Sequence, residues 1–166
     1  MAETETLSPV LDEDIEKATL RLLEKACARE LTLATAESCT GGMLASLLTD
    51  VEGCAHVFER GFVTYTDESK AEMLGIPLDL IKQEGAVSRA VAIAMAEAAL
   101  ERSKAHVALS VTGYADTGEE PGLVHLACAR QGRVTAHREA HFGPVGRGAT
   151  RVKSLRVAVE MMTEML

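Results

Sequence analysis

Residues 35–42 read TAESCTGG and combine residue types that can support chemistry. Ser38 carries a hydroxyl, and Gly41 and Gly42 allow the backbone to approach a ligand closely. A serine at the start of a helix can act as a nucleophile, because free N–H groups of the first turn bind an anion or a developing oxyanion. Ser and Thr also commonly cap helices, so a cap formed by Ser38 or Thr40 is the structural alternative.

A serine nucleophile needs a base. His137 and His141 lie on one face of a strand-like segment, about 13 Å apart, which is too far for two ligands of one metal ion. We therefore expect neither a Ser–His pair nor a metal site there. Lys70 is the better candidate, because it falls in the first turn of a helix that Thr66 or Asp67 can cap. A helix N-terminus and burial both lower the pKa of an amine. The alternative for Lys70 is a solvated surface lysine.

Helices and strands that alternate along the chain must position these residues. Periodicity and turn residues predict helices at about 11–29, 42–48, 67–75, 88–104 and 146–165. Strands are expected at 31–35, 61–66, 106–112, 122–131 and 133–142, the last two forming a hairpin. This pattern predicts the α/β class, as a layered α/β/α single domain with a mixed, partly parallel sheet. Residues 35–42 then fall where a strand ends and a helix begins, the edge at which open α/β sheets bind ligands.

Composition excludes several classes of function. The chain has 166 residues, of which 47% are hydrophobic, so one domain with a proper core is expected. A net charge of -8 opposes binding to a nucleic-acid backbone, and no apolar stretch is long enough to span a bilayer. The acidic start lacks the features of a secretion signal, so we expect a flexible N-terminus over 1–10 and a cytoplasmic location. Irregular spacing predicts free thiols at Cys27, Cys39, Cys54 and Cys128.

Three motifs in order carry a resemblance to a known family: TAESCTGG at 35–42, RGFVTYTDESKAEMLG at 60–75 and GAVS at 85–88. Together they resemble the nicotinamide mononucleotide deamidase family, which is similar to the C-terminal domain of the competence/damage-inducible protein CinA. The resemblance runs from about residue 12 to the C-terminus, so residues 11–166 are expected to form the deamidase domain. It implies hydrolysis of the amide of nicotinamide mononucleotide to a carboxylate and ammonia, without a metal or organic cofactor. Together with an Ala- and Met-rich surface helix, it also favours a homodimer.

The resemblance assigns the catalytic roles by motif. Ser38 resembles the nucleophile and Lys70 the general base, with Tyr65 as a nearby helper. Thr112 and Gly113 resemble a turn that lines the ligand site.

Substrate binding is assigned to the remaining motif residues. Glu37, Thr40, Gly41 and Gly42 belong to the serine motif. Arg147 and Arg151, spaced by four near the start of the last helix, could hold a phosphate from one helical face; the alternative is a solvated face.

Two ligand-facing segments depart from the family pattern. The loop YADTGEEPG, residues 114–122, is shorter and has Asp116 and Thr117 where the family has Gly-Pro, and the segment before Arg147 is longer. The intact Ser38 and Lys70 favour an amidohydrolase acting on nicotinamide mononucleotide or a close relative. The altered loop favours a catalytically inactive or altered-specificity nucleotide-binding CinA-like protein. A role in DNA uptake or damage response rests on the family name alone.

Overall fold

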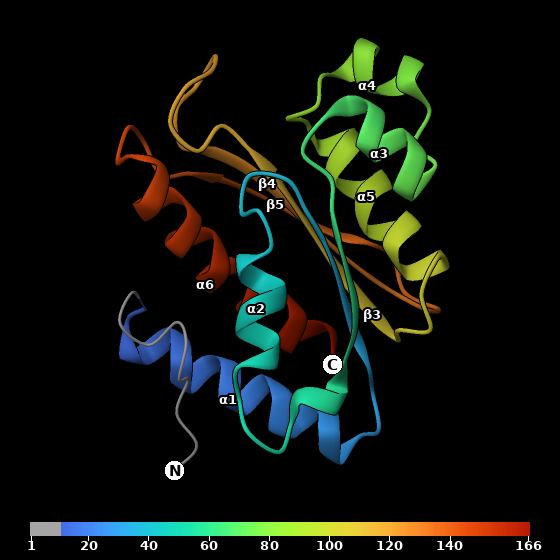
Figure 1. The fold of residues 1–166 in the computed structure, drawn as a ribbon, viewed down its shortest axis with the longest axis vertical. Coiled ribbons are helices and arrows are strands. Elements are labelled where there is room, and N and C mark those ends of the chain that lie inside the picture. The colour runs from blue at the N-terminus through green and yellow to red at the C-terminus, as the bar shows by residue number, and fades with distance from the viewer. Residues whose placement is uncertain (1–10) are drawn as a thin grey trace.

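A five-stranded sheet forms the centre of the computed structural model, which describes residues 11–166 (Figure 1). The expected flexible N-terminus, residues 1–10, lies outside the described residues. In spatial order the strands are β2-β1-β3-β4-β5. Their bounds are Leu33–Glu37 for β1, Phe58–Val63 for β2, Val107–Gly113 for β3, Leu123–Arg130 for β4 and Ala136–His141 for β5.

The sheet is mixed, as the sequence predicts. Strand β1 pairs in parallel with β2 on one side and with β3 on the other. The β3–β4 and β4–β5 pairs are antiparallel. The predicted hairpin is therefore confirmed as β4–β5, in which Leu123 lies opposite His141 and Cys128 opposite Ala136.

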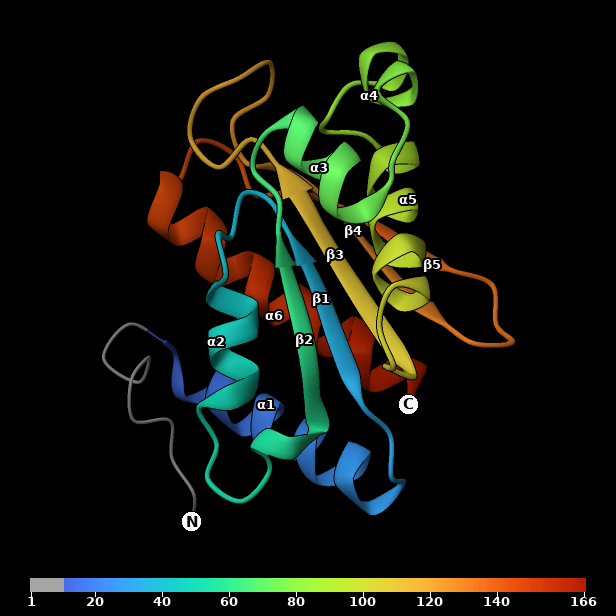
Figure 2. The ribbon, with the colours of Figure 1, turned by 45° about the vertical axis from the view of Figure 1, so that its right-hand side comes forward.

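Helices cover both faces of the sheet, so the predicted α/β/α layering is confirmed (Figure 2). One layer contains α1 (Glu13–Ala28), α2 (Met43–Thr49) and α6 (Arg147–Met165), and the short 3-10 helix η2 (Ala55–Val57) lies beside it. The other layer contains α3 (Asp67–Leu74), α4 (Leu78–Glu84) and α5 (Arg89–Glu101). Within residues 11–166, none of the helices is both long and apolar enough to cross a membrane.

The predicted strand over 61–66 is wrong in its bounds. Strand β2 begins at Phe58 and ends at Val63, and residues 64–66 lead into α3 instead. The reason is a capping box: the Thr66 hydroxyl accepts a hydrogen bond from the Ser69 N–H, and the Thr66 N–H donates to the Ser69 hydroxyl, both at 3.1 Å. Helix α4, which follows Pro77, was not predicted.

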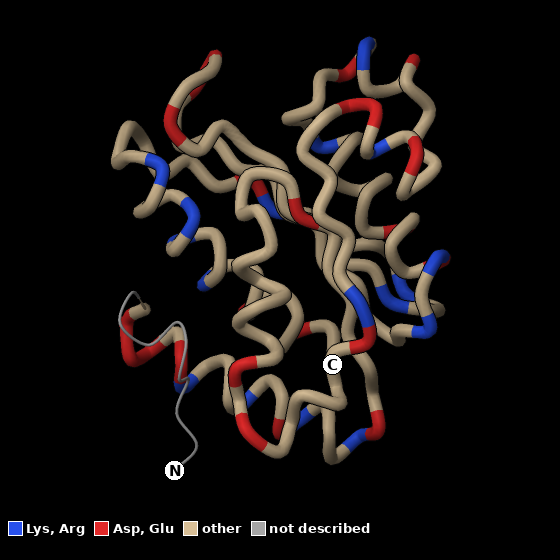
Figure 3. The backbone as a smooth tube through the Cα atoms, viewed as in Figure 1, with Lys and Arg blue, Asp and Glu red and all other residues tan. Residues whose placement is uncertain are grey.

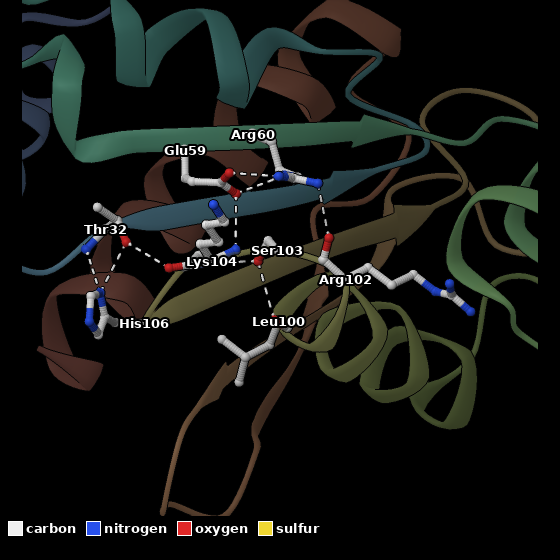
Figure 4. A network of polar contacts seen from close by, with 9 residues as sticks. Thr32, Glu59, Arg60, Leu100, Arg102, Ser103, Lys104 and His106 are labelled. Carbon is white, nitrogen blue, oxygen red and sulfur yellow. Dashed lines mark hydrogen bonds and ion pairs between the residues drawn. The ribbon is translucent and has the colours of Figure 1, made fainter.

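A polar network fixes the edge strand β2 at the end of the sheet opposite these caps (Figure 4). The Arg60 Nη1 group donates to the Arg102 carbonyl at 3.1 Å, across to the end of α5. The Glu59 carboxylate accepts from the Lys104 N–H at 3.3 Å and pairs with Arg60 Nε at 2.7 Å. The start of β2 is thereby tied to the α5–β3 connection.

Candidate active site

The three parallel strands end together at one edge of the sheet. Glu37, the last residue of β1, lies opposite Val63 of β2 and Val111 of β3. The chain leaves β1 toward α2 on one face and leaves β2 toward α3 on the other face. Such a divergence opens a crevice beyond the strand ends, where open α/β sheets bind ligands. The predicted position of residues 35–42 at a strand-to-helix junction is confirmed.

Lys70 lies in this crevice and is fully buried, at 0% exposure. Its Nζ donates hydrogen bonds to the Ser38 Oγ at 3.1 Å, the Thr64 carbonyl at 3.0 Å and the Tyr65 carbonyl at 3.2 Å. Within residues 11–166 it forms no ion pair with a carboxylate. Burial lowers the pKa of Lys70, and the weaker opposing influences of Asp67 and Cys39 do not reverse this. The surface alternative for Lys70 is therefore wrong.

The first turn of α3 directs Lys70 toward Ser38. Thr66 is the N-cap of the helix, and the Lys70 N–H donates to its carbonyl at 3.1 Å, which closes the turn. Tyr65 is 66% exposed, and the part of it that contacts Lys70 is its backbone carbonyl. Ser38 itself is nearly buried, and its N–H donates to the Val111 carbonyl at 2.9 Å, which extends the β1–β3 ladder by one residue.

Glu37 caps helix α2 with its side chain. The fully buried carboxylate accepts hydrogen bonds from the N–H groups of Gly42 at 3.1 Å, Leu44 at 3.0 Å and Ala45 at 2.8 Å. It also accepts from the Thr40 hydroxyl at 2.6 Å. The expectation that the first turn of this helix offers free N–H groups to a ligand is therefore wrong for these three donors.

The structural alternative for the serine motif is also wrong. The N-cap residue of α2 is Gly42, and neither Ser38 nor Thr40 caps the helix with its hydroxyl. Gly41 and Gly42 have positive φ angles of 60° and 95°, which glycine adopts without strain and which the tight turn requires.

The two arginines of α6 have different surroundings. The Arg151 Nη2 group donates to the Thr40 carbonyl at 2.6 Å, and a Cβ atom on Gly41 would lie 3.4 Å from the same nitrogen. Arg151 therefore holds the turn that follows Ser38. Arg147, the first residue of α6, is exposed and lines the pocket beside Ser38.

A pocket of about 210 Å³ opens onto Ser38 and Lys70. Residues predicted for the site that line it are Ser38, Tyr65, Lys70, Thr112, Gly113 and Arg147. Predicted residues outside its lining are Glu37, Thr40, Gly41, Gly42 and Arg151. Lining residues without a predicted role of their own are Cys39, Ala86, Val87, Tyr114, Ala115 and Thr117, of which the last three lie in the 114–122 loop that was expected to face the ligand. Ala86 and Val87 fall in the GAVS motif, which was the available signal, and the Thr112 hydroxyl donates to the Ala86 carbonyl at 2.7 Å.

Arg147 is the basic residue of α6 that lines this pocket, and the adjoining 114–122 loop is acidic. Figure 3 places the acidic residues of the 114–122 loop at the same end of the molecule as the start of α6, with its basic residues. The His141 ring contacts Glu120 of the loop at 2.6 Å and Glu139 at 2.7 Å, and both hydrogen bonds raise the pKa of His141. Asp116 and Glu119 remain exposed on the loop.

The histidines lie outside the pocket lining. His125 and His137 contact each other through Nδ1 and Nε2 at 3.1 Å, on the β4–β5 hairpin. Among the described residues, no group of His, Cys, Asp and Glu side chains is arranged to hold a metal ion. The prediction of free thiols is confirmed for Cys27, Cys39, Cys54 and Cys128.

Comparisons with known proteins agree with this architecture. A CinA-like protein of Akkermansia muciniphila is 52% identical over 123 residues, which cover 68% of this chain and only 30% of that protein. The nicotinamide-nucleotide amidohydrolase PncC of Escherichia coli K12 is 41% identical over 141 residues, covering 81% of this chain and 84% of PncC.

Solved structures support the same relationship. The competence/damage-inducible protein CihA of Agrobacterium tumefaciens has a TM-score of 0.90 at 40% identity, covering 93% of this chain and 97% of CihA. A CinA superfamily protein of Escherichia coli has a TM-score of 0.86 at 34% identity, covering 94% of both chains. Residues 14–166 match the CinA C-terminal domain, and the chain belongs to that family.

Proposed function

We propose that this protein hydrolyses the amide of nicotinamide mononucleotide, or of a close relative, to the acid and ammonia. The observation that carries the proposal is the buried Lys70 Nζ, 3.1 Å from the Ser38 Oγ and with no counter-ion among residues 11–166. The similarity to PncC, whose name gives nicotinamide nucleotides as its substrates, supports the choice of substrate.

In the proposed mechanism Lys70 acts in its neutral form. Its two N–H groups donate to the Thr64 and Tyr65 carbonyls, which leaves the nitrogen lone pair to accept the Ser38 hydroxyl proton. The Ser38 Oγ then attacks the amide carbon, and the proton held by Lys70 passes to the leaving ammonia. Water then attacks the resulting ester as Lys70 accepts a proton from it, and Lys70 returns that proton to the Ser38 Oγ as the bond between Oγ and the acyl carbon breaks. Burial favours this chemistry because it increases the neutral fraction of the lysine.

The pocket suggests how the substrate lies. Its volume of about 210 Å³ is below the range of 300–1,000 Å³ typical of ligand pockets, so we assign it to the carboxamide-bearing ring. Thr112 and Gly113 line it together with Ser38, and the exposed Tyr65 is assigned to its rim. The phosphate role falls to Arg147, because Arg151 is engaged with the Thr40 carbonyl.

The residues around Ser38 that lie outside the pocket lining have a different role in this proposal. Glu37, Thr40, Gly41 and Gly42 shape the turn and hold it against α2, and they do not contact the ligand. Tyr65 contributes its carbonyl to Lys70 and its exposed ring to the rim.

The acidic loop favours a second candidate, a family member with altered specificity. Asp116, Glu119 and Glu120 bring negative charge toward the end of the molecule where Arg147 lies, which weakens binding of a phosphate. The test is ammonia release by the purified protein from nicotinamide mononucleotide and from nicotinamide riboside. Release from either supports the hydrolase, and the ratio of the two kcat/KM values reports the specificity. Release from neither favours the catalytically inactive nucleotide-binding protein.

A homodimer and a cytoplasmic location belong to the same proposal. The Ala- and Met-rich helix α5 does not support the dimer, because its apolar residues pack inside this domain, with Ala92, Met95 and Ala96 fully buried. Exposed large hydrophobic residues instead include Val63, Tyr65 and Met73. Light scattering of the purified protein measures the mass directly.

A further inference from the structure

We propose that the backbone N–H of Cys39 binds the oxyanion that forms when Ser38 attacks the substrate carbonyl. This inference rests on the proposed hydrolase function and adds a catalytic group to it. A donor placed where negative charge develops stabilises the transition state, and the residue after a nucleophilic serine supplies such a donor in other folds.

The start of helix α2 does not provide this site. Its N–H groups from Gly42, Leu44 and Ala45 all donate to the carboxylate of Glu37 at 2.8–3.1 Å. Those donors are occupied, and a buried carboxylate beside them repels a second negative oxygen. The donor must therefore come from elsewhere in the turn.

Elimination along the turn leaves two N–H groups. The Ser38 N–H donates to the Val111 carbonyl at 2.9 Å, and the Gly41 N–H donates to the Ser38 carbonyl at 3.1 Å. The Met43 N–H donates to the Thr40 carbonyl at 3.2 Å. Within the described part of the chain, the Cys39 N–H donates to no other residue, and its interaction with the Cys39 thiol lowers the pKa of that thiol. The Thr40 N–H has no acceptor among the hydrogen bonds of residues 11–166.

Of these two groups, the Cys39 N–H belongs to a residue that lines the pocket. Cys39 follows Ser38 directly, whereas Thr40 is fully buried and does not line the pocket. The Thr40 hydroxyl and carbonyl are engaged with Glu37 and Arg151, neither of which lines the pocket.

Charges of both signs act at Cys39. Burial raises the pKa of the Cys39 thiol to about 12, so the thiol stays neutral and neither repels the oxyanion nor replaces Ser38 as nucleophile. The Glu37 carboxylate also raises this pKa, whereas the positive charges of Arg151 and Lys70 lower it, because they favour negative charge at this position.

Ser38, Lys70 and the Cys39 N–H account for every bond and proton that changes in the acylation step. A bond forms between the Ser38 Oγ and the carbonyl carbon, the serine proton moves to the Lys70 Nζ, and the carbonyl π pair moves to oxygen. The Cys39 N–H donates to that oxygen. The pair then returns to re-form the carbonyl as the carbon–nitrogen bond breaks, and ammonia leaves with the proton from Lys70.

Replacing this single N–H with an ester oxygen tests the inference. The reference protein is Cys39→Ala, and the test protein carries lactic acid, the hydroxy-acid counterpart of alanine, at position 39. Matched ester proteins at Thr40 and at the exposed Gly53, remote from the pocket, control for the loss of a neighbouring N–H and for the ester itself. The position-39 ester should lower kcat for nicotinamide mononucleotide about 10²–10³-fold, with KM and the pH midpoint unchanged. An unchanged kcat, or an equal loss with the position-40 ester, overturns the inference.

A second measurement covers the case in which the ester protein does not fold. A phosphonate that reacts with Ser38 places a negatively charged tetrahedral oxygen where the oxyanion forms, and intact mass verifies the adduct. The amide proton of Cys39 should then move downfield in the NMR spectrum, while those of Gly42 and Leu44 stay in place. An adduct that leaves the Cys39 amide unmoved contradicts the inference alone. A wild-type protein that neither releases ammonia nor forms the adduct contradicts the proposed function itself.

Discussion

Replacing Lys70 by Met and by Arg separates a general base from a structural cation. Methionine has no proton acceptor, and the guanidinium of arginine stays charged at any accessible pH, so neither can take the Ser38 proton. Both variants should therefore lose hydrolysis to the same extent. Wild-type activity should rise with pH along one ionisation below the ordinary lysine value of 10.5, because burial lowers the pKa of Lys70 and the neutral amine is the base.

The contacts of Lys70 set the size of the expected loss. Removing a positioned general base costs about 10²–10⁴-fold in rate, or about 2.7–5.4 kcal/mol of transition-state stabilisation. Because the Nζ contacts the Ser38 Oγ directly, the two side chains act as a unit, and the loss should lie at the upper end of this range.

Ammonia release from nicotinamide mononucleotide, measured as kcat across pH for each variant, checks this prediction. Circular dichroism and thermal melting serve as controls that each variant is folded. If Lys70→Arg keeps most of the wild-type kcat, or if the wild-type rate rises only above pH 10.5, Lys70 is not the base and the reasoning fails.

Three further predictions concern the surroundings of Ser38 and Lys70. Glu37→Ala removes the carboxylate that accepts from three N–H groups at the start of α2. It should lower the free energy of unfolding by about 1.5–3 kcal/mol, which corresponds to a melting temperature about 3–12 °C lower. An unchanged melting temperature would contradict the capping role of Glu37. Arg147→Ala should raise KM for the mononucleotide about tenfold and leave KM for the riboside unchanged. Arg151→Ala should instead lower kcat for both substrates, because Arg151 holds the turn that follows Ser38. Equal effects of Arg147→Ala on the two KM values would refute its phosphate role. The pKa of Lys70 is lowered in the folded state, so the unfolded chain binds more protons between that pKa and 10.5. In chemical denaturation, the free energy of unfolding of the wild type relative to Lys70→Met should therefore increase with pH over this window, by at most about 1.4 kcal/mol per pH unit. A difference that is constant with pH would argue against a lowered pKa.

Local patterns in the sequence predicted the layered fold, the strand-to-helix junction at Ser38 and the first-turn position of Lys70, whereas the pairing of these two residues was predicted only from the family resemblance. The alternating residues LTLAT at 31–35 are followed by polar residues and two glycines up to residue 42. This change alone indicates that a strand ends there and a turn begins. Lys70 could be placed in the first turn of a helix because Thr66 and Asp67 precede it, and that turn directs it into the crevice.

The role of Glu37 could not be predicted in the same way. An acid beside a serine suggests ligand binding, whereas here its carboxylate reaches over five residues of turn to the N–H groups of α2. Competition between a carboxylate of the protein and a ligand for the same donors depends on the path of the turn, which periodicity does not encode. The capping box at Thr66 likewise ended β2 earlier than its β-forming residues suggest.

The roles of several residues in the pocket wall were not predicted, because the wall is formed by segments that are distant in the sequence. Ala86 and Val87 precede α5, and Tyr114 and Thr117 follow β3. These segments meet at the pocket only through the crossover that places β3 beside β1, and each carries residue types that are ordinary in a loop.

Trapping with hydroxylamine tests the central claim, that Ser38 is acylated by the substrate, most directly. An acyl-enzyme on Ser38 passes its acyl group to hydroxylamine in competition with water. Wild-type protein turning over nicotinamide mononucleotide should therefore form the hydroxamate in proportion to the hydroxylamine added, with ammonia still released, and Ser38→Ala should form none. Full ammonia release with the acid as the sole product at every hydroxylamine concentration would contradict the account.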